Sequence, residues 1–423
     1  MVLVILLVVL ALLGAPLFTI LAGAAMLGFW HDGTPLTVMG VEIYRIVDTP
    51  VLLALPLFTY AGYILGEGHT SRRLVRLTRA LLGWLPGGLA IVAFTTCSFF
   101  TAFTGASGAT IVAMGALLYP ALRQAGYNER FSLGLVTTSG SLGLLLPPSL
   151  PLILYAIIAQ QLPQGAGVTI DALFLAGVLP ALLMVVLLSF YGYWVTRRNP
   201  IELQPFCWKE LGLAVAEAKW ELPLPVFVLG GIYGGFFAVS EAAAVTALYV
   251  TFVAVAVYRE VRPDRLIVLM REAMMMVGGI LLILAVAMAL TNWFIDAEIP
   301  SRLFEFVRGH VDSKWTFLLL LNVFLLFLGC FLDIFSALVI MVPLLLPIAT
   351  GFGIHPVHLG IIFLANMEIG YCTPPVGMNL MIASYRFKKP MLELAASTMP
   401  FLAVLMLAVL IITFVPALSL AWL

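Results

Sequence analysis

The chain has 423 residues, of which 63% are hydrophobic and only 10% are charged, and its mean hydropathy is +1.12. This composition excludes a soluble globular protein and predicts an all-α polytopic membrane protein. Basic and acidic residues balance at 21 each, so no charged tail indicates nucleic-acid binding or attachment to a membrane surface.

The first apolar stretch runs from Val2 to Trp30 and is interrupted at Gly14 to Pro16. It lacks a basic start and a clear cleavage site, so we expect a retained helix. A spanning helix needs about 20 residues, and the number of crossings in residues 1–30 therefore stays open. Pro50 to Leu65 predicts a spanning helix. In Ser71 to Leu82 the arginines and leucines separate onto two faces, which favours a helix on the cytoplasmic membrane surface.

The next apolar stretch, about residues 85–122, has a tip rich in Gly, Ser and Thr at Phe103 to Thr110. Arginines flank it on both sides, and positive residues mark the cytoplasmic side. We therefore predict a re-entrant helical hairpin that enters and leaves on that side. Two full crossings are the alternative.

Residues 131–159 form an apolar stretch that Gly140, Pro147 and Pro148 interrupt. A helix can lose backbone hydrogen bonds in lipid only where protein or a polar cavity replaces them. This stretch therefore predicts a helix that is broken at membrane depth. Phe174 to Val195 predicts the return crossing, which ends the first half at residues 1–195, and the basic linker 196–221 is expected to be cytoplasmic.

The second half, residues 222–423, repeats this order. The number of crossings in residues 222–258 stays open, because several glycines interrupt them. The predicted elements that follow are a crossing at Met274 to Phe294, a surface helix at Pro300 to Arg308, a hairpin at about 315–349, a broken helix at 357–385 and a crossing at Pro400 to Leu420. With opposite orientation in the two halves, this is the pattern of an inverted-repeat transporter.

Unwound helices and hairpin tips expose main-chain groups that suit Na⁺ and carboxylates. The sequence predicts two such sodium and substrate sites. The first combines Thr104, Ser107, Gly108, Thr110, Ser139, Gly140, Pro147, Pro148 and Ser149. The second combines Gly329, Asp333, Ser336, Gly370, Thr373, Pro374, Pro375, Gly377 and Asn379.

Asp333 is the sharpest single signal, because an acid at membrane depth costs about 2.5 to 3.5 kcal/mol and usually marks an ion or proton site. The alternative is an N-cap for the helix that follows. Glu241 and Glu368 are also embedded in apolar stretches. Each could act directly or pair with a backbone donor, so their roles stay open.

Four stretches together resemble the large membrane subunit of tripartite ATP-independent periplasmic (TRAP) transporters. They are Phe103 to Thr110, Gly140 to Ser149, Gly329 with Asp333, Pro343 and Pro347, and Asn366 to Asn379 with its Thr-Pro-Pro-Val-Gly core. The resemblance covers nearly the whole chain. In one departure, Ala238-Val-Ser stands before Glu241, where the family often has Thr-Pro-Thr.

The resemblance implies an elevator mechanism in the bacterial inner membrane that imports an organic acid with Na⁺ as the coupling ion and no other cofactor. It also implies a small four-helix membrane subunit and a periplasmic substrate-binding protein as partners. The substrate could be a C4-dicarboxylate or a sialic-acid-like molecule.

Two other functions remain as alternatives. The first is a stand-alone Na⁺/dicarboxylate symporter with the related elevator fold. The second is an intramembrane serine protease, since Gly105-Ala-Ser107 fits a Gly-x-Ser pattern. A protease needs a base close to its nucleophile, and all five histidines fall in predicted connections, so we expect no enzyme.

Overall fold

The computed structural model of the chain describes all residues except 1–6, 8, 11–12, 48, 199–204 and 312. The described residues form helices and connections without a strand. The described helices up to residue 198 are α2 (Leu17–His31), α3 (Thr37–Val47), η1 (Pro50–Leu53), α4 (Ala54–Glu67), α5 (Thr70–Leu82), α6 (Gly88–Thr104), α7 (Ser107–Gln124), α8 (Glu129–Ser139), α9 (Leu150–Gln160), η2 (Pro163–Gly165) and α10 (Ile170–Arg198).

The remaining described helices include one π-helical turn, η3. They are α11 (Trp208–Glu217), α12 (Pro223–Tyr233), α13 (Val239–Phe252), η3 (Val253–Val257), α14 (Pro263–Asp296), α15 (Ile299–Arg308), α16 (Lys314–Phe331), α17 (Ile334–Gly351), α18 (Pro356–Gly370), α19 (Met378–Phe387), α20 (Met391–Phe414) and α21 (Ala417–Leu420).

Seven described helices are long and apolar enough to cross a membrane. They are Pro50–Glu67, Ile170–Arg197, Val239–Val257, Pro263–Asp296, Lys314–Phe331, Ile334–Gly351 and Met391–Phe414. Shorter apolar helices, such as α9 and α18, lie between them. The prediction of an all-α polytopic membrane protein is confirmed.

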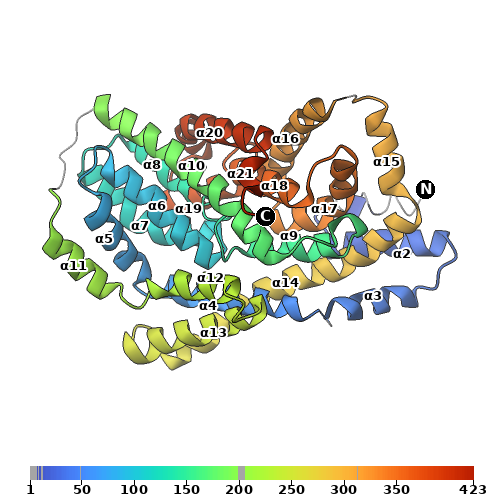
Figure 1. Cartoon of the computed structure of the whole chain (residues 1–423), viewed down its shortest axis with the longest axis horizontal. Helices are drawn as coiled ribbons and strands as arrows, with labels where there is room; N and C mark the ends of the chain where they lie inside the picture. Colours follow the sequence, from blue (N-terminus) through green and yellow to red (C-terminus); the bar gives the residue numbers. More distant parts are fainter. Residues whose placement is uncertain (1–6, 8, 11–12, 48, 199–204, 312) are drawn as a thin grey trace.

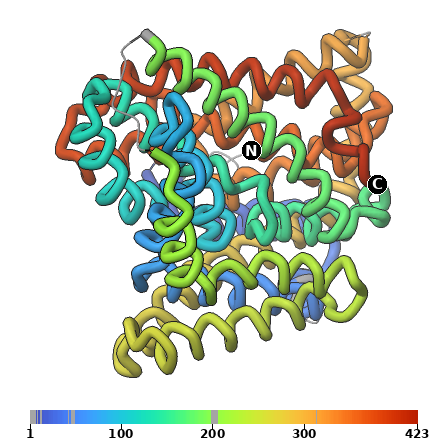
Figure 2. The backbone as a smooth tube through the Cα atoms, turned by 60° about the vertical axis from the view of Figure 1, so that its left-hand side comes forward, coloured from blue at the N-terminus to red at the C-terminus, as the bar shows by residue number. Residues whose placement is uncertain are grey.

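The helices form two layers, which Figure 1 shows along the lower and upper parts of the view and Figure 2 shows again after rotation. In the lower layer α4 packs on α13 and α14, and α2 packs on α14. In the upper layer α8 packs on α6, α7 and α20, and α18 packs on α16, α17 and α20. The core is deepest there, because every residue from Val357 to Gly370 is buried.

Two helical hairpins occur where the sequence places them. Gly105 and Ala106 join α6 to α7, and Gly105 has φ +64°, a left-handed conformation that glycine adopts without strain. In the second hairpin Leu332 and Asp333 join α16 to α17, and Asp333 caps the helix that follows.

Two helices are broken, also where prolines and glycines predict it. Residues 140–149 separate α8 from α9, and residues 371–377 separate α18 from α19. Each break contains a cis peptide bond between two prolines, Pro147-Pro148 and Pro374-Pro375. The breaks differ in exposure, because Pro147 and Pro148 are buried whereas Pro374 and Pro375 are exposed.

Several boundaries differ from the predictions. The last long helix is α20, which begins at Met391 and ends at Phe414, so the predicted crossing at Pro400 to Leu420 is shifted. Pro400 lies inside this helix, and Pro416 lies two residues beyond its end. The predicted crossing Met274 to Phe294 is the inner part of the 34-residue α14, which Pro263 starts.

The linker contains the helix α11, which the sequence interpretation missed. In residues 222–258 the glycines separate α12 from α13, and only Val239–Val257 is long enough to span. The retained helix expected in the stretch Val2 to Trp30 lies partly outside the described residues. Its described part holds α2.

Candidate functional site

The tip of the first hairpin is anchored to the first break by buried hydroxyl groups. The Thr101 hydroxyl lies 2.9 Å from the Gly140 carbonyl oxygen and 2.7 Å from the Thr110 hydroxyl oxygen. Gly143 packs so tightly that a Cβ atom there would lie 2.1 Å from the Ser98 carbonyl oxygen. The main chain of α6 and the unwound segment are therefore in direct contact.

The same hairpin also contacts the second half of the chain. The Ser107 hydroxyl donates a 2.8 Å hydrogen bond to Asn379 Oδ1, and both side chains are buried. A Cβ atom at Gly108 would lie 2.6 Å from Ile382 Cδ1 of α19. The sequence assigns Ser107 and Asn379 to separate sites, and the structure brings these two residues together.

The second hairpin packs on the second break in the same way. A Cβ atom at Gly370 would lie 2.6 Å from the Cα atom of Gly329, so the backbones of α16 and α18 touch. The Gly377 amide donates a 3.1 Å hydrogen bond to the Cys330 carbonyl oxygen. The Ile334 amide donates to the Tyr371 hydroxyl oxygen. Residues 329–334 and 370–377 thus form one polar junction.

Asp333 lies at the tip of the second hairpin as the N-cap of α17. Its Oδ2 accepts a 3.0 Å hydrogen bond from the Ser336 amide, and its Oδ1 accepts one from the Ser336 hydroxyl. The capping geometry that the sequence left as an alternative is therefore present. A carboxylate still has lone pairs for a cation, so the cap does not decide the ion role.

Most other hydroxyl groups predicted for the sites bond to nearby carbonyl oxygens. Thr104 donates to Phe100 over 3.0 Å, Thr373 to Ile369 over 2.9 Å, and Ser149 donates to Leu144. Ser139 donates over 3.3 Å to Val136. The donor protons are used within the fold, which leaves the oxygen lone pairs for a ligand.

Glu368 is a fully buried acid one turn before the second break. Neither of its carboxyl oxygens forms a hydrogen bond within the described part of the chain. The buried hydroxyl of Thr137 in α8 is also unpaired there. The two predicted sites do not include Glu368. An acidic residue next to a helix break was the sequence feature that pointed to it.

Glu241 has the backbone pairing that the sequence left open. It lies in the first turn of α13, is exposed, and accepts a 2.9 Å hydrogen bond from the Ala238 amide through Oε2. This arrangement caps the start of α13. The Ala238-Val-Ser sequence supplies the amide donor.

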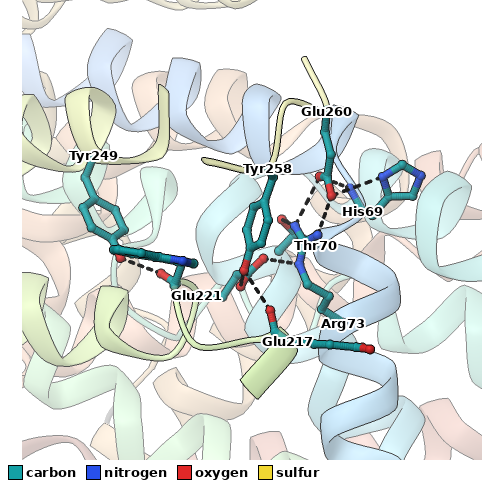
Figure 3. Close-up of polar contacts among 9 residues, drawn as sticks. His69, Thr70, Arg73, Glu217, Glu221, Tyr249, Tyr258 and Glu260 are labelled. Carbon is teal, nitrogen blue, oxygen red and sulfur yellow. Dashed lines mark hydrogen bonds and ion pairs between the residues drawn. The ribbon is translucent and has the colours of Figure 1, made fainter. Parts of the chain in front are cut away.

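A cluster of charged residues fixes α5, the helix that leads into the first hairpin (Figure 3). The Arg73 guanidinium pairs with Glu221 at the end of the linker and with Glu260 before α14. It also lies 3.9 Å from the centre of the Tyr258 ring, and the Tyr258 hydroxyl donates a 2.9 Å hydrogen bond to Glu221. Arg73 therefore joins α5 to two segments that lie 148 and 187 residues away in the sequence.

The electrostatics of this cluster favour the charged forms. Burial lowers the pKa of Arg73, but hydrogen bonds and ion pairs with Glu260 and Glu221 outweigh it, and the net pKa is raised. For Glu260, burial raises the pKa, whereas Arg73 and the His69 amide lower it, with a net pKa below the ordinary value. Arg73, Glu221 and Glu260 therefore form a network of ion pairs, which we call the clasp.

The protease alternative does not fit the geometry. The Ser107 hydroxyl donates to Asn379 and not to a histidine. The prediction that all five histidines lie in connections is wrong for His31 and His358. His31 ends α2, and His358 is buried in the first turn of α18, where it contacts the Thr413 carbonyl oxygen at 3.3 Å.

The fold as a whole is that of a membrane transporter. The structure matches the Alcanivorax borkumensis YdaH transporter, whose crystal structure was described as having an unusual topology, with a TM-score of 0.63. The match covers 91% of this chain and 88% of that chain at 16% sequence identity. At this identity the likeness defines the fold alone.

Sequence comparison then defines the family. Residues 3–418 match the family described as "Tripartite ATP-independent periplasmic transporter, DctM component", and the chain belongs to this family. It is 34% identical to the C4-dicarboxylate TRAP transporter large permease protein DctM of Rhodobacter capsulatus, over 98% of this chain and 97% of that protein. It is 32% identical to the ectoine TRAP transporter large permease protein TeaC of Halomonas elongata, over 97% and 96%.

A third relative is longer than this chain. The isethionate TRAP transporter permease protein DctMQ of Oleidesulfovibrio alaskensis is 36% identical over 96% of this chain, and the chain spans 63% of its length. These relatives are transporter permeases, and the family is not enzymatic. The protein is a multi-pass membrane permease subunit.

Proposed function

We propose that this chain imports an organic acid together with Na⁺ across the bacterial inner membrane. The names of the relatives described above identify them as permeases for C4-dicarboxylates, ectoine or isethionate. The observation that carries the proposal is the meeting of each hairpin with the helix break of its own half, through Thr101 with Gly140 and through Gly329 with Gly370. Such junctions expose carbonyl oxygens and helix ends, which suit Na⁺ and a carboxylate.

The described residues offer oxygen atoms to a cation. The hydroxyl of Thr137 and the carboxyl of Glu368 are buried without hydrogen-bond partners in the described part of the chain, and Asp333 places its carboxyl at the tip of the second hairpin. Moving a monoanion inward is opposed by the membrane potential, at about 2.3 kcal/mol per charge for 100 mV. At least two Na⁺ would be needed to make the transported set net positive.

The two halves would form an inverted repeat, in which the hairpins and broken helices move as a transport domain against the lower layer. The resemblance to the TRAP family supports two partners, a small membrane subunit and a periplasmic binding protein. The name DctMQ of the longer relative is consistent with a second membrane component.

The test is uptake into proteoliposomes that hold the chain with both partners, driven by a Na⁺ gradient. We expect uptake to require Na⁺ and both partners. If this chain alone transports a dicarboxylate, the stand-alone symporter is correct instead. If uptake does not depend on Na⁺, sodium coupling is refuted.

Asp333 is tested by two matched variants. Asp333→Asn keeps an oxygen that can cap α17 and removes the charge, whereas Asp333→Ala removes both. For a cation ligand, we expect both variants to raise the Na⁺ concentration for half-maximal uptake about tenfold or more, equivalent to about 1.4 kcal/mol. If Asp333→Asn keeps the wild-type Na⁺ dependence, Asp333 is a cap and not a ligand.

A further inference from the structure

The basic face of α5 borders a cavity that the transport proposal does not use. Arg72, Arg76 and Arg79 follow one another at helical spacing, and all three line this cavity. Its volume is about 570 Å³, and it lies between α5, the end of α7 and the segment Pro205 to Cys207. This volume and the basic lining suit a ligand with a compact charged group.

The charge of the cavity is positive. Glu210 is the one acidic residue among its described lining residues, and Arg76 is paired both with Glu210, at 2.8 Å, and with Glu217. Arg72 is exposed, and its side chain makes no hydrogen bond or ion pair with another residue of the described part of the chain. An anionic group could therefore bind here without displacing an existing contact of Arg72.

Aromatic side chains form the rim of the cavity. Trp84 is 47% exposed, and its ring lies edge-on to Phe206 with centroids 6.4 Å apart. Trp208, next to this pair, is 77% exposed and packs against Phe206. Exposed tryptophans beside arginines are typical of the membrane–water interface, where lipid phosphates lie.

The opposite flank of α5 is apolar. A second cavity of about 250 Å³ lies there, lined mainly by leucines of α5 such as Leu77 and Leu81 and by Phe99 and Phe103 of α6. Leu81 is 49% exposed. One helix thus borders a charged cavity on one flank and an apolar cavity on the other.

A similar pocket occurs at α15, which holds the corresponding place in the second half. There Arg308 and Lys314 line a cavity of about 460 Å³ with Phe304 and Phe352. The combination of basic and aromatic side chains is therefore repeated at the helix that precedes each hairpin.

We propose that the cavity bordered by Arg72, Arg76 and Trp84 binds the headgroup of an anionic phospholipid. Arg72 holds the phosphate, the aromatic rim lies at headgroup depth, and an acyl chain passes to the apolar flank of α5. By the charge rule for membrane proteins, the leaflet is the cytoplasmic one. The bound lipid would hold α5 and the segment before α11 together.

The experiment is native mass spectrometry of the purified full chain after equilibration with phosphatidylglycerol and phosphatidylcholine of the same acyl chains. We compare the wild type with Arg72→Gln and with Arg130→Gln, a control that removes one exposed arginine outside the cavity. We expect the wild type to retain phosphatidylglycerol preferentially. Arg72→Gln should weaken that binding about fivefold, the contribution of one basic residue near a charged lipid surface, and Arg130→Gln should leave it unchanged.

Three outcomes would overturn the proposal. Equal retention of the two lipids would remove the anionic specificity. Equal losses in Arg72→Gln and Arg130→Gln would place the lipid elsewhere. Displacement of phosphatidylglycerol by an equal concentration of inorganic phosphate would show that the cavity binds free anions and not a lipid.

Discussion

The contact between Gly329 and Gly370 allows a quantitative test of how the second hairpin is held against the second break. In Gly370→Ala the new Cβ atom would lie 2.6 Å from the Gly329 Cα atom and 2.7 Å from its carbonyl carbon. Carbon atoms in contact normally lie about 3.5 to 4.0 Å apart. The backbones of α16 and α18 must therefore separate by about 1 Å. Because the neighbouring atoms are main chain, no side-chain rotation can relieve the clash.

Overpacking of this kind costs about 1–3 kcal/mol, and we expect a lower apparent unfolding temperature together with slower Na⁺-driven uptake. Gly329→Ala should be milder, because its Cβ atom would lie 3.0 Å from the Gly370 Cα atom. The control is Gly279→Ala in α14, where a Cβ atom meets nothing within 4 Å. Thermal unfolding in detergent and uptake in proteoliposomes give the two measurements. If Gly370→Ala is as stable as Gly279→Ala, the close packing described here is incorrect.

Two further predictions concern polar contacts. In Ser107→Ala, Asn379 loses a buried partner, which should cost about 1–3 kcal/mol of stability. A double-mutant cycle with Asn379→Ala should show a coupling energy above about 0.5 kcal/mol. Additive effects of the two substitutions would mean that the two residues do not interact. Arg73→Gln leaves Glu221 and Glu260 without their cation and should destabilise the protein more than Arg130→Gln does. Because the pKa of Glu260 is lowered in the folded state, its contribution to stability is present above its ordinary pKa and is lost as the pH falls below about 4.5. Thermal unfolding at several pH values should show this loss in the wild type and a weaker one in Arg73→Gln, and identical pH profiles would contradict the clasp.

The sequence predicted the elements that proline, glycine and charge control. Two proline pairs lie in long apolar stretches, namely Pro147 with Pro148 and Pro374 with Pro375. A helix cannot continue through such pairs. The arginines of α5 likewise fix an amphipathic helix, and its bounds match within one residue at the start. These features depend on local chemistry, which a single sequence contains.

Other features depend on contacts between distant residues. Ser107 and Asn379 are 272 positions apart, and nothing in either motif says that the first hairpin touches α19. The helix α11 is short, and its residues pack on α5 partly through pairs such as Arg76 with Glu210, so its sequence alone gave little signal. Pro400 illustrates the opposite error, because the sequence predicts a helix start at this proline although α20 accommodates it in its interior. The roles of the site residues and the relation of the two halves to the membrane stay predictions.

The two breaks are not equivalent in this conformation, and this difference bears on the mechanism. The first break is closed to solvent, since all of residues 140–149 except Leu146 are buried. The second break reaches the surface at Pro374, Pro375 and Val376. In a transporter that alternates between two sides of a membrane, only one access route is open at a time. Under the proposed transport function, we expect the exposed second break to be the entry or exit for a solute in this state. The contact between Ser107 and Asn379 joins the first hairpin to the helix that follows this break.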